Sequence, residues 1–218
     1  TIEQNRLSKI NNLINKISKQ QLNFNDEKLR IFIPACRETT VMQYVSKDIA
    51  TYMQSKNFEV LFYIQDELGN CNLLSLLEQQ YNFNPHIIIQ INHINNQYLN
   101  KDIFNFVWFQ DAMPILTDKK PIILRDRDFI FSYAKIFTKM LIKNNVSKNK
   151  IFKQDVFPVD TNQFYYDKKI TKKDKIVFVG SYYNTKNRIP QNLYISNKLD
   201  SKLKQSINKG KILTTKKI

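Results

Sequence analysis

Glycine and cysteine are both scarce in this chain of 218 residues, which holds three glycines and two cysteines. Phosphate-binding loops of the dinucleotide and nucleoside-triphosphate types need several glycines close together, so both types are excluded. Two cysteines cannot build a disulfide-rich scaffold, and we interpret Cys36 and Cys71 as reduced, partly buried thiols of a cytosolic protein. No apolar run approaches the roughly 20 residues of a membrane span, and no signal peptide is recognisable.

Histidine and arginine are few as well. The two histidines stand in no metal-binding spacing such as Cys-x-x-Cys or His-Glu-x-x-His, so the sequence predicts neither a metal ion nor another cofactor. Only six of the 34 basic residues are arginine, the residue on which sequence-specific readers of nucleic acid rely. The 28 lysines accompany 25 asparagines and 28 isoleucines, a combination typical of an AT-rich genome. Nucleic acid is therefore not the expected partner.

The net charge of +15 is distributed unevenly along the chain. Residues 31–170 carry sixteen basic and fourteen acidic side chains, whereas residues 171–218 carry twelve basic and only two acidic ones. The basic excess therefore belongs mainly to the C-terminal 48 residues. Lysine drift, an anionic ligand and a membrane surface are the explanations that remain open.

Short apolar runs alternate with segments of helical periodicity from residue 29 onward. This alternation predicts a Rossmann-like α/β domain, in which a parallel sheet carries helices on both faces. Strands are expected at 29–33, 58–64, 86–91, 103–109, 128–133 and 151–157, with a short additional strand at 122–124. Helices are expected at 40–56, 72–81 and 134–145, after an amphipathic helix at 2–20.

Single residues refine these expectations. Pro34 is expected to stop the first strand. Helical spacing assigns six residues to the apolar face of the helix at 40–56: Val41, Tyr44, Val45, Ile49, Tyr52 and Met53. The same reasoning turns Ile136 inward, together with Met140 and Leu141.

We expect three parts along the chain. Residues 1–29 form an N-terminal helical segment, which packs on the main domain or on a part of the protein outside this sequence. Residues 30–165 form the Rossmann-like domain, and residues 166–218 hold a polar linker and the start of a second Rossmann-like unit with a lysine-rich tail. The run Ile176-Val-Phe-Val179, which ends in Gly180-Ser181, is expected to be the strand that begins this second unit.

Ligands of parallel sheets bind beyond the carboxyl ends of the strands, and two polar groups stand there. His93, after Asn92, would act as a general base or bind a diphosphate or a sugar hydroxyl; the alternative is that it satisfies backbone groups of its loop. Asp111, after Gln110, would orient a substrate or abstract a proton; the alternative is a turn cap. His86 opens its strand at the opposite end and is not expected to act in catalysis.

Three further groups of residues were considered. Arg37 and Glu38 lie in the first strand–helix loop, where Arg37 would contact a phosphate or the two would form a solvated pair. The residues Arg125 to Asp128 alternate in charge, which indicates a surface ion-pair cluster. The combination suited to a diphosphate comprises Gly180, Ser181, Lys186 and Arg188.

The order of these segments resembles that of bacterial two-domain (GT-B) glycosyltransferases of the spore-coat and O-antigen type. The resemblance covers roughly residues 30–190. One of its motifs is Phe157-Pro-Val-Asp-Thr-Asn-Gln-Phe164, which precedes a polar linker. After the linker comes Phe178-Val-Gly-Ser181, with Arg188 downstream. Ile91-Asn-His93 and Val107-Trp-Phe-Gln-Asp111 look like the acceptor-domain strand ends of the same group.

The resemblance implies two facing Rossmann domains that transfer a sugar from a nucleotide-diphosphate sugar, without a metal, to a surface glycan, lipid-linked or protein acceptor. Asp111 or His93 would face the acceptor. The donor diphosphate would lie near Gly180, Ser181, Lys186 and Arg188. The chain would be an acceptor-side fragment, inactive alone, located in the cytoplasm with peripheral contact at the inner face of the membrane.

Two other functions remain open at this point. The chain could be a non-enzymatic Rossmann-like binding module whose residues 171–218 form a basic arm for nucleic acid or acidic partners. An enzyme of another Rossmann class, such as a sugar-nucleotide epimerase, is the weaker alternative because the glycine-rich loop is missing.

Overall fold

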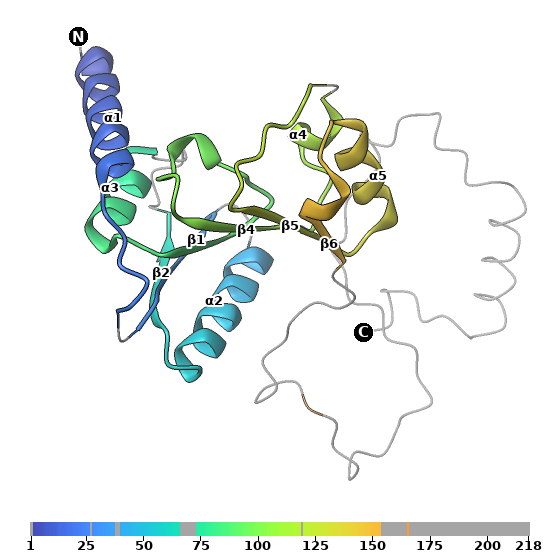
Figure 1. The fold of residues 1–218 in the computed structure, drawn as a ribbon, viewed down its shortest axis with the longest axis horizontal. Helices are drawn as coiled ribbons and strands as arrows, with labels where there is room; N and C mark the ends of the chain where they lie inside the picture. The colour runs from blue at the N-terminus through green and yellow to red at the C-terminus, as the bar shows by residue number, and fades with distance from the viewer. Residues whose placement is uncertain are drawn as a thin grey trace, which may run out of the picture. The chain divides into compact units, whose positions relative to one another are not determined.

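A computed structural model describes residues 2–26, 28–37, 40–65, 73–118, 120–153 and 165. The chain divides into two units, Thr1–Phe164 and Tyr165–Ile218. The described part of the first unit is built on one six-stranded sheet, in which every strand pair is parallel (Figure 1). Its strands are β1 (Arg30–Ala35), β2 (Glu59–Ile64), β3 (Ile87–Ile91), β4 (Phe104–Phe109), β5 (Asp128–Ser132) and β6 (Ile151–Lys153). The predicted Rossmann-like α/β class is thereby confirmed.

The strand order is β2-β1-β3-β4-β5-β6, so the chain reverses its direction across the sheet between β1 and β3. Helix α2 (Thr40–Ser55) packs on Ile31 and Ile33, whereas α3 (Leu73–Phe83) packs on Phe32, which points to the opposite face. This order is the second common doubly wound arrangement, and its ligands bind where the direction reverses. The carboxyl ends of β1 and β3 therefore mark the expected crevice.

The N-terminal helix α1 (Ile2–Lys19) packs on α3 rather than directly on the sheet. Ile10 and Ile17 of α1 are buried against Leu77 of α3, and Figure 1 shows the two helices side by side. Of the two expectations for this segment, packing on the main domain is the one observed. The layers on this face are thus sheet, α3 and α1.

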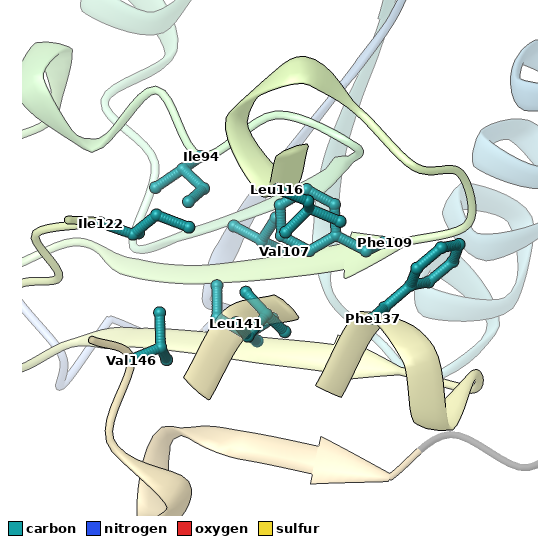
Figure 2. Close-up of a cluster of buried hydrophobic side chains, with 9 residues drawn as sticks. Ile94, Val107, Phe109, Leu116, Ile122, Phe137, Leu141 and Val146 are labelled. Atoms are coloured by element: carbon teal, nitrogen blue, oxygen red, sulfur yellow. The ribbon is translucent and has the colours of Figure 1, made fainter. Parts of the chain in front are cut away.

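A second core lies on the face of the sheet that α3 covers, over strands β4 and β5. Val107 and Phe109 of β4 pack against Leu116 of the short helix α4 (Pro114–Thr117) and against Phe137 and Leu141 of α5 (Lys135–Lys143), as Figure 2 shows. Of the residues expected to turn inward, Leu141 is buried, but Ile136 is 57% exposed. Phe137 takes the inward position instead, four residues before Leu141 on the same helix face, and Met140 packs against this core as expected.

The connection between β3 and β4, residues 92–103, holds only one 3₁₀ turn, η1 (Asn96–Tyr98), where most parallel crossovers carry a helix. A polar network fixes this connection to the sheet. The buried Asp128 accepts five hydrogen bonds, from Asn96, Asn105 and the backbone and side chain of Arg125. Asn105 in turn accepts a hydrogen bond from the buried Gln90, 2.8 Å from Nε2 to Oδ1. The expected surface ion-pair cluster at 125–128 is therefore wrong for Asp128, which is 0% exposed.

Three other expectations are corrected by the structure. Pro34 lies inside β1, opposite Tyr63 of β2, and does not stop the strand. No strand forms at 122–124; the buried Ile122 donates its backbone N–H to the carbonyl of Asn144 instead. On α2, Val41, Tyr44 and Tyr52 are exposed, because the helix turns two small residues, Ser46 and Ala50, toward the sheet.

Pro34 remains in the strand because its missing N–H faces the side where no partner is needed. The carbonyl of Arg30 accepts from His86 of the β3 side, whereas the carbonyl of Ala35 accepts from Gln65 of the β2 side. Pro34 shares the orientation of Arg30 by the two-residue period, so it faces β3. The β1–β3 ladder ends after Phe32. Pro34 therefore costs no ladder hydrogen bond, because β1 and β3 no longer pair at its position.

Replacing Asp128 with alanine is expected to lower the free energy of unfolding by about 3–5 kcal/mol, because the Arg125 guanidinium and two amides lose their acceptor. Urea unfolding followed by circular dichroism measures this loss. Asp126→Ala is the matched control, since Asp126 is exposed two residues away, and its cost is expected to stay within about 0.5 kcal/mol. Equal costs for the two variants would refute the role assigned to the network.

Candidate functional site

Asn92, the first residue after β3, ties the ends of β3 and β4 together. Its φ of 63° is left-handed, a conformation that asparagine tolerates better than most residues. Its side chain is buried, and Oδ1 accepts the backbone N–H groups of Gln110 at 2.7 Å and Asp111 at 3.2 Å. Its Nδ2 donates to the Asp111 carboxylate at 2.9 Å. An exposed carboxylate is thus held at the carboxyl edge by a buried amide.

His93 follows Asn92 at the carboxyl edge of the sheet and lines two hollows. The larger is a cleft of about 610 Å³, which we call the amide-lined cleft. The smaller, about 30 Å³, lies where β1 and β3 separate and is also lined by Pro34, Cys36 and Ser46. His93 therefore stands at the point where the doubly wound topology predicts a ligand.

The amide-lined cleft has a neutral polar side and an apolar side. The neutral side consists of the amides of Asn92, Asn95, Asn96 and Gln97 beside His93. Its charged lining residues, among those described, are one acid and one base, Asp118 and Lys120. The apolar side is formed by Ile94, Met113, Pro114, Ile115, Ile122 and Ile123. The side-chain N–H groups of Asn95 and Asn96 are bonded within the protein, which leaves their carbonyl oxygens as acceptors that suit uncharged hydroxyl groups better than phosphates.

The polar network of the fold also positions this lining. Asn95, with a left-handed φ of 45°, donates its side-chain N–H to Gln90 at 3.0 Å. Asn96 donates to the buried Asp128 at 2.7 Å. Their anchored side chains hold the loop that forms the wall of the cleft. A wall fixed by buried hydrogen bonds loses little freedom when a ligand binds.

Ser46 is a residue of the site that sequence reasoning missed. It is 1% exposed, and its hydroxyl has no hydrogen-bond partner among the described residues. It stands on α2 and faces the small hollow between β1 and β3. A buried polar group without a partner is uncommon and is often found where a ligand binds. A serine in the apolar pattern of α2 was the only sequence signal for it.

The predicted site residues fall into three groups. The structure brings together Asn92, Gln110 and Asp111 in one hydrogen-bonded cluster, with His93 adjacent in the chain. Arg37 is exposed at the end of β1, and its guanidinium donates to the carbonyl of Gln65. The residues Glu38, Gly180, Ser181, Lys186 and Arg188 lie outside the described residues.

His86 and Cys36, which are not expected to act in catalysis, lie in surroundings that give them a structural role. His86 is buried, with Nδ1 accepting the backbone N–H of Arg30 at 3.0 Å and Nε2 lying 2.8 Å from the carbonyl of Asn23. It therefore fastens the connection between α1 and β1. Cys36 is a half-buried thiol, as expected, whereas Cys71 lies outside the described residues.

Within the described ranges, no group of three or more His, Cys, Asp or Glu side chains is placed to hold a metal ion. No helix in these ranges has the length and apolar character needed to cross a membrane. No protein-family model, curated protein or solved structure matches the chain.

Replacing Asn92 with aspartate is expected to destabilise the protein above about pH 5, because two carboxylates would then face each other across a contact of 2.9 Å. Protonation of one of them restores the hydrogen bond. The pKa of that pair would thus be raised in the folded state, and stability would be lost as the pH rises. Thermal unfolding between pH 4 and pH 8 measures this trend.

The matched control is Asn82→Asp, which makes the same chemical change at an exposed position of α3. Its pH dependence is expected to follow that of the unmodified protein. If Asn92→Asp also follows the unmodified protein, the Asn92–Asp111 contact does not hold in solution.

Proposed function

We propose that this chain is the acceptor-side part of a glycosyltransferase, which transfers a sugar from a nucleotide-diphosphate sugar to a hydroxyl of a glycan, lipid-linked or protein acceptor. The observation that carries the proposal is the amide-lined cleft of about 610 Å³ beside the Asn92–Asp111 contact. Its neutral amides match the hydroxyl groups of a sugar, and its apolar side matches the carbon face of a sugar ring.

The reaction needs a base at the acceptor. The acceptor hydroxyl oxygen forms a bond to the anomeric carbon of the donor, and the bond from that carbon to the diphosphate oxygen breaks. The electron pair leaves with the diphosphate, and the hydroxyl proton passes to a base. Asp111 is the first candidate for this base because Asn92 holds its carboxylate at the carboxyl edge. His93, which lines the amide-lined cleft, is the second candidate.

The donor side of the proposal rests on the resemblance in sequence. Gly180, Ser181, Lys186 and Arg188 would stabilise the leaving diphosphate through backbone N–H groups and positive charge. The proposal includes a cytoplasmic location with peripheral membrane contact, which the lysines of residues 171–218 support.

Asp111→Asn is expected to lower sugar transfer by about 10²–10⁴-fold in the full-length protein, because the amide keeps the contact with Asn92 but cannot accept a proton. Release of nucleoside diphosphate from a panel of nucleotide sugars measures transfer, and titration calorimetry shows that nucleotide binding is retained. Asp118→Asn is the control, since it removes a carboxylate that lines the amide-lined cleft but has no contact with Asn92. Unchanged turnover in Asp111→Asn would exclude Asp111 as the base.

Saccharide binding tests the cleft without any donor. In heteronuclear NMR titrations with mono- and disaccharides, saturable shifts are expected at Asn92–Gln97 and Ile122–Ile123, which line it. Two results together would contradict the transferase and favour a basic binding module. The shifts would spread over the surface lysines instead of concentrating in the cleft. The protein would also bind single-stranded or duplex DNA tightly, with a steep salt dependence.

A further inference from the structure

A second cleft, about 480 Å³ in volume, lies between α5 and β6. We call it the lysine cleft because Lys135, Lys139, Lys148 and Lys153 line it from three different elements. Ile142 and Ile151 form an apolar part of its lining. It shares no described lining residue with the amide-lined cleft, so it is a separate site.

The described residues that line the lysine cleft include four lysines and no acidic side chain. Residues 129–154 contain six lysines and no aspartate or glutamate. Lys135, Lys139 and Lys148 form no ion pair with any residue that the structure describes. Cations that converge on one hollow repel one another, and an anion between them removes the repulsion. The arrangement therefore favours a negatively charged ligand.

The start of α5 is an independent indication of the same ligand. Ala134 occupies the N-cap position with φ −96° and ψ 128°, and no side chain caps the helix. The first turn carries no acidic residue and begins with Lys135, the reverse of the charge that a helix N-terminus prefers. The backbone N–H groups of Lys135 and Ile136 donate to no described residue. Two donors at the positive end of the helix thus lack an acceptor among the described residues, and one of them belongs to Lys135, which lines the lysine cleft.

We propose that the lysine cleft binds an organic phosphate or diphosphate that carries an apolar group. The phosphate oxygens accept the N–H groups of Lys135 and Ile136 in place of a cap, and Lys135 and Lys139 neutralise the charge. The apolar group lies against Ile142, which is 38% exposed, and Ile151. A free organic phosphate and the headgroup of an anionic lipid are two sources of this one chemistry.

Titration calorimetry with inorganic pyrophosphate tests the charged part of the site on the full chain. Lys135→Gln/Lys139→Gln is expected to weaken binding by at least about tenfold, since charge-assisted hydrogen bonds are lost. The matched control is Lys47→Gln/Lys143→Gln, which removes two exposed lysines outside the cleft, one of them on α5 itself. Its affinity is expected to stay within about twofold of the unmodified protein. Equal weakening in both variants would overturn the proposal.

Ala134→Asp tests the helix N-terminus without touching a lysine. The new carboxylate caps α5 and takes the position of the anion, so the free protein is expected to melt a few degrees higher. Pyrophosphate binding is expected to be lost at the same time. Pyrophosphate that binds Ala134→Asp as tightly as the unmodified protein would show that the N-terminus of α5 is not the site.

Two further probes separate the sources. Dodecyl phosphate below its micelle concentration is expected to bind more tightly than pyrophosphate, because Ile142 and Ile151 contact the chain. Binding no tighter than that of inorganic phosphate would overturn the apolar part of the proposal. Co-sedimentation with phosphatidylglycerol vesicles that is lost in Lys135→Gln/Lys139→Gln, but kept in the control, assigns the site to a lipid headgroup. Equal co-sedimentation of both variants, with pyrophosphate binding lost only in the first, assigns it to a free phosphate.

Discussion

A single buried carboxylate holds together the part of the fold on which the candidate site depends. Asp128 is fully buried at the start of β5, and a charge in that position is tolerated only when its hydrogen bonds are complete. Its partners fasten the β3–β4 connection where no helix covers the sheet. The loop that carries His93 and the cleft amides has its shape because of this network. Asn96 belongs both to this network and to the lining of the amide-lined cleft. A substitution that disturbs the network is therefore expected to alter the cleft.

Much of the fold could be predicted from sequence because parallel strands are apolar on both faces and stand out between periodic helices. The errors have local causes. Ser46 and Ala50 face the sheet because small side chains let α2 approach closely, a reason that a hydrophobicity pattern does not contain. The charge alternation at 125–128 predicts surface residues, but it does not show which member is buried, and Asp128 is the buried one.

Only those residues of the candidate site that directly follow a strand could be predicted from the sequence. Asn92, His93, Gln110 and Asp111 follow apolar runs, so their position at the carboxyl edge could be inferred. Asn95 and Asn96 look like ordinary turn residues in sequence, and their role depends on Gln90 and Asp128, which are five and 32 residues away. The hydroxyl of Ser46 could not be linked to the crevice without the topology that brings α2 to the ends of β1 and β3.

Pro34 lies just beyond the last rung of the β1–β3 ladder and lines the small hollow between these strands. The β1–β3 ladder ends after Phe32, and the backbone nitrogen of Pro34, which faces β3, has no proton to donate to a further rung. A hollow of this kind is preorganised: entering molecules do not have to break a strand ladder first.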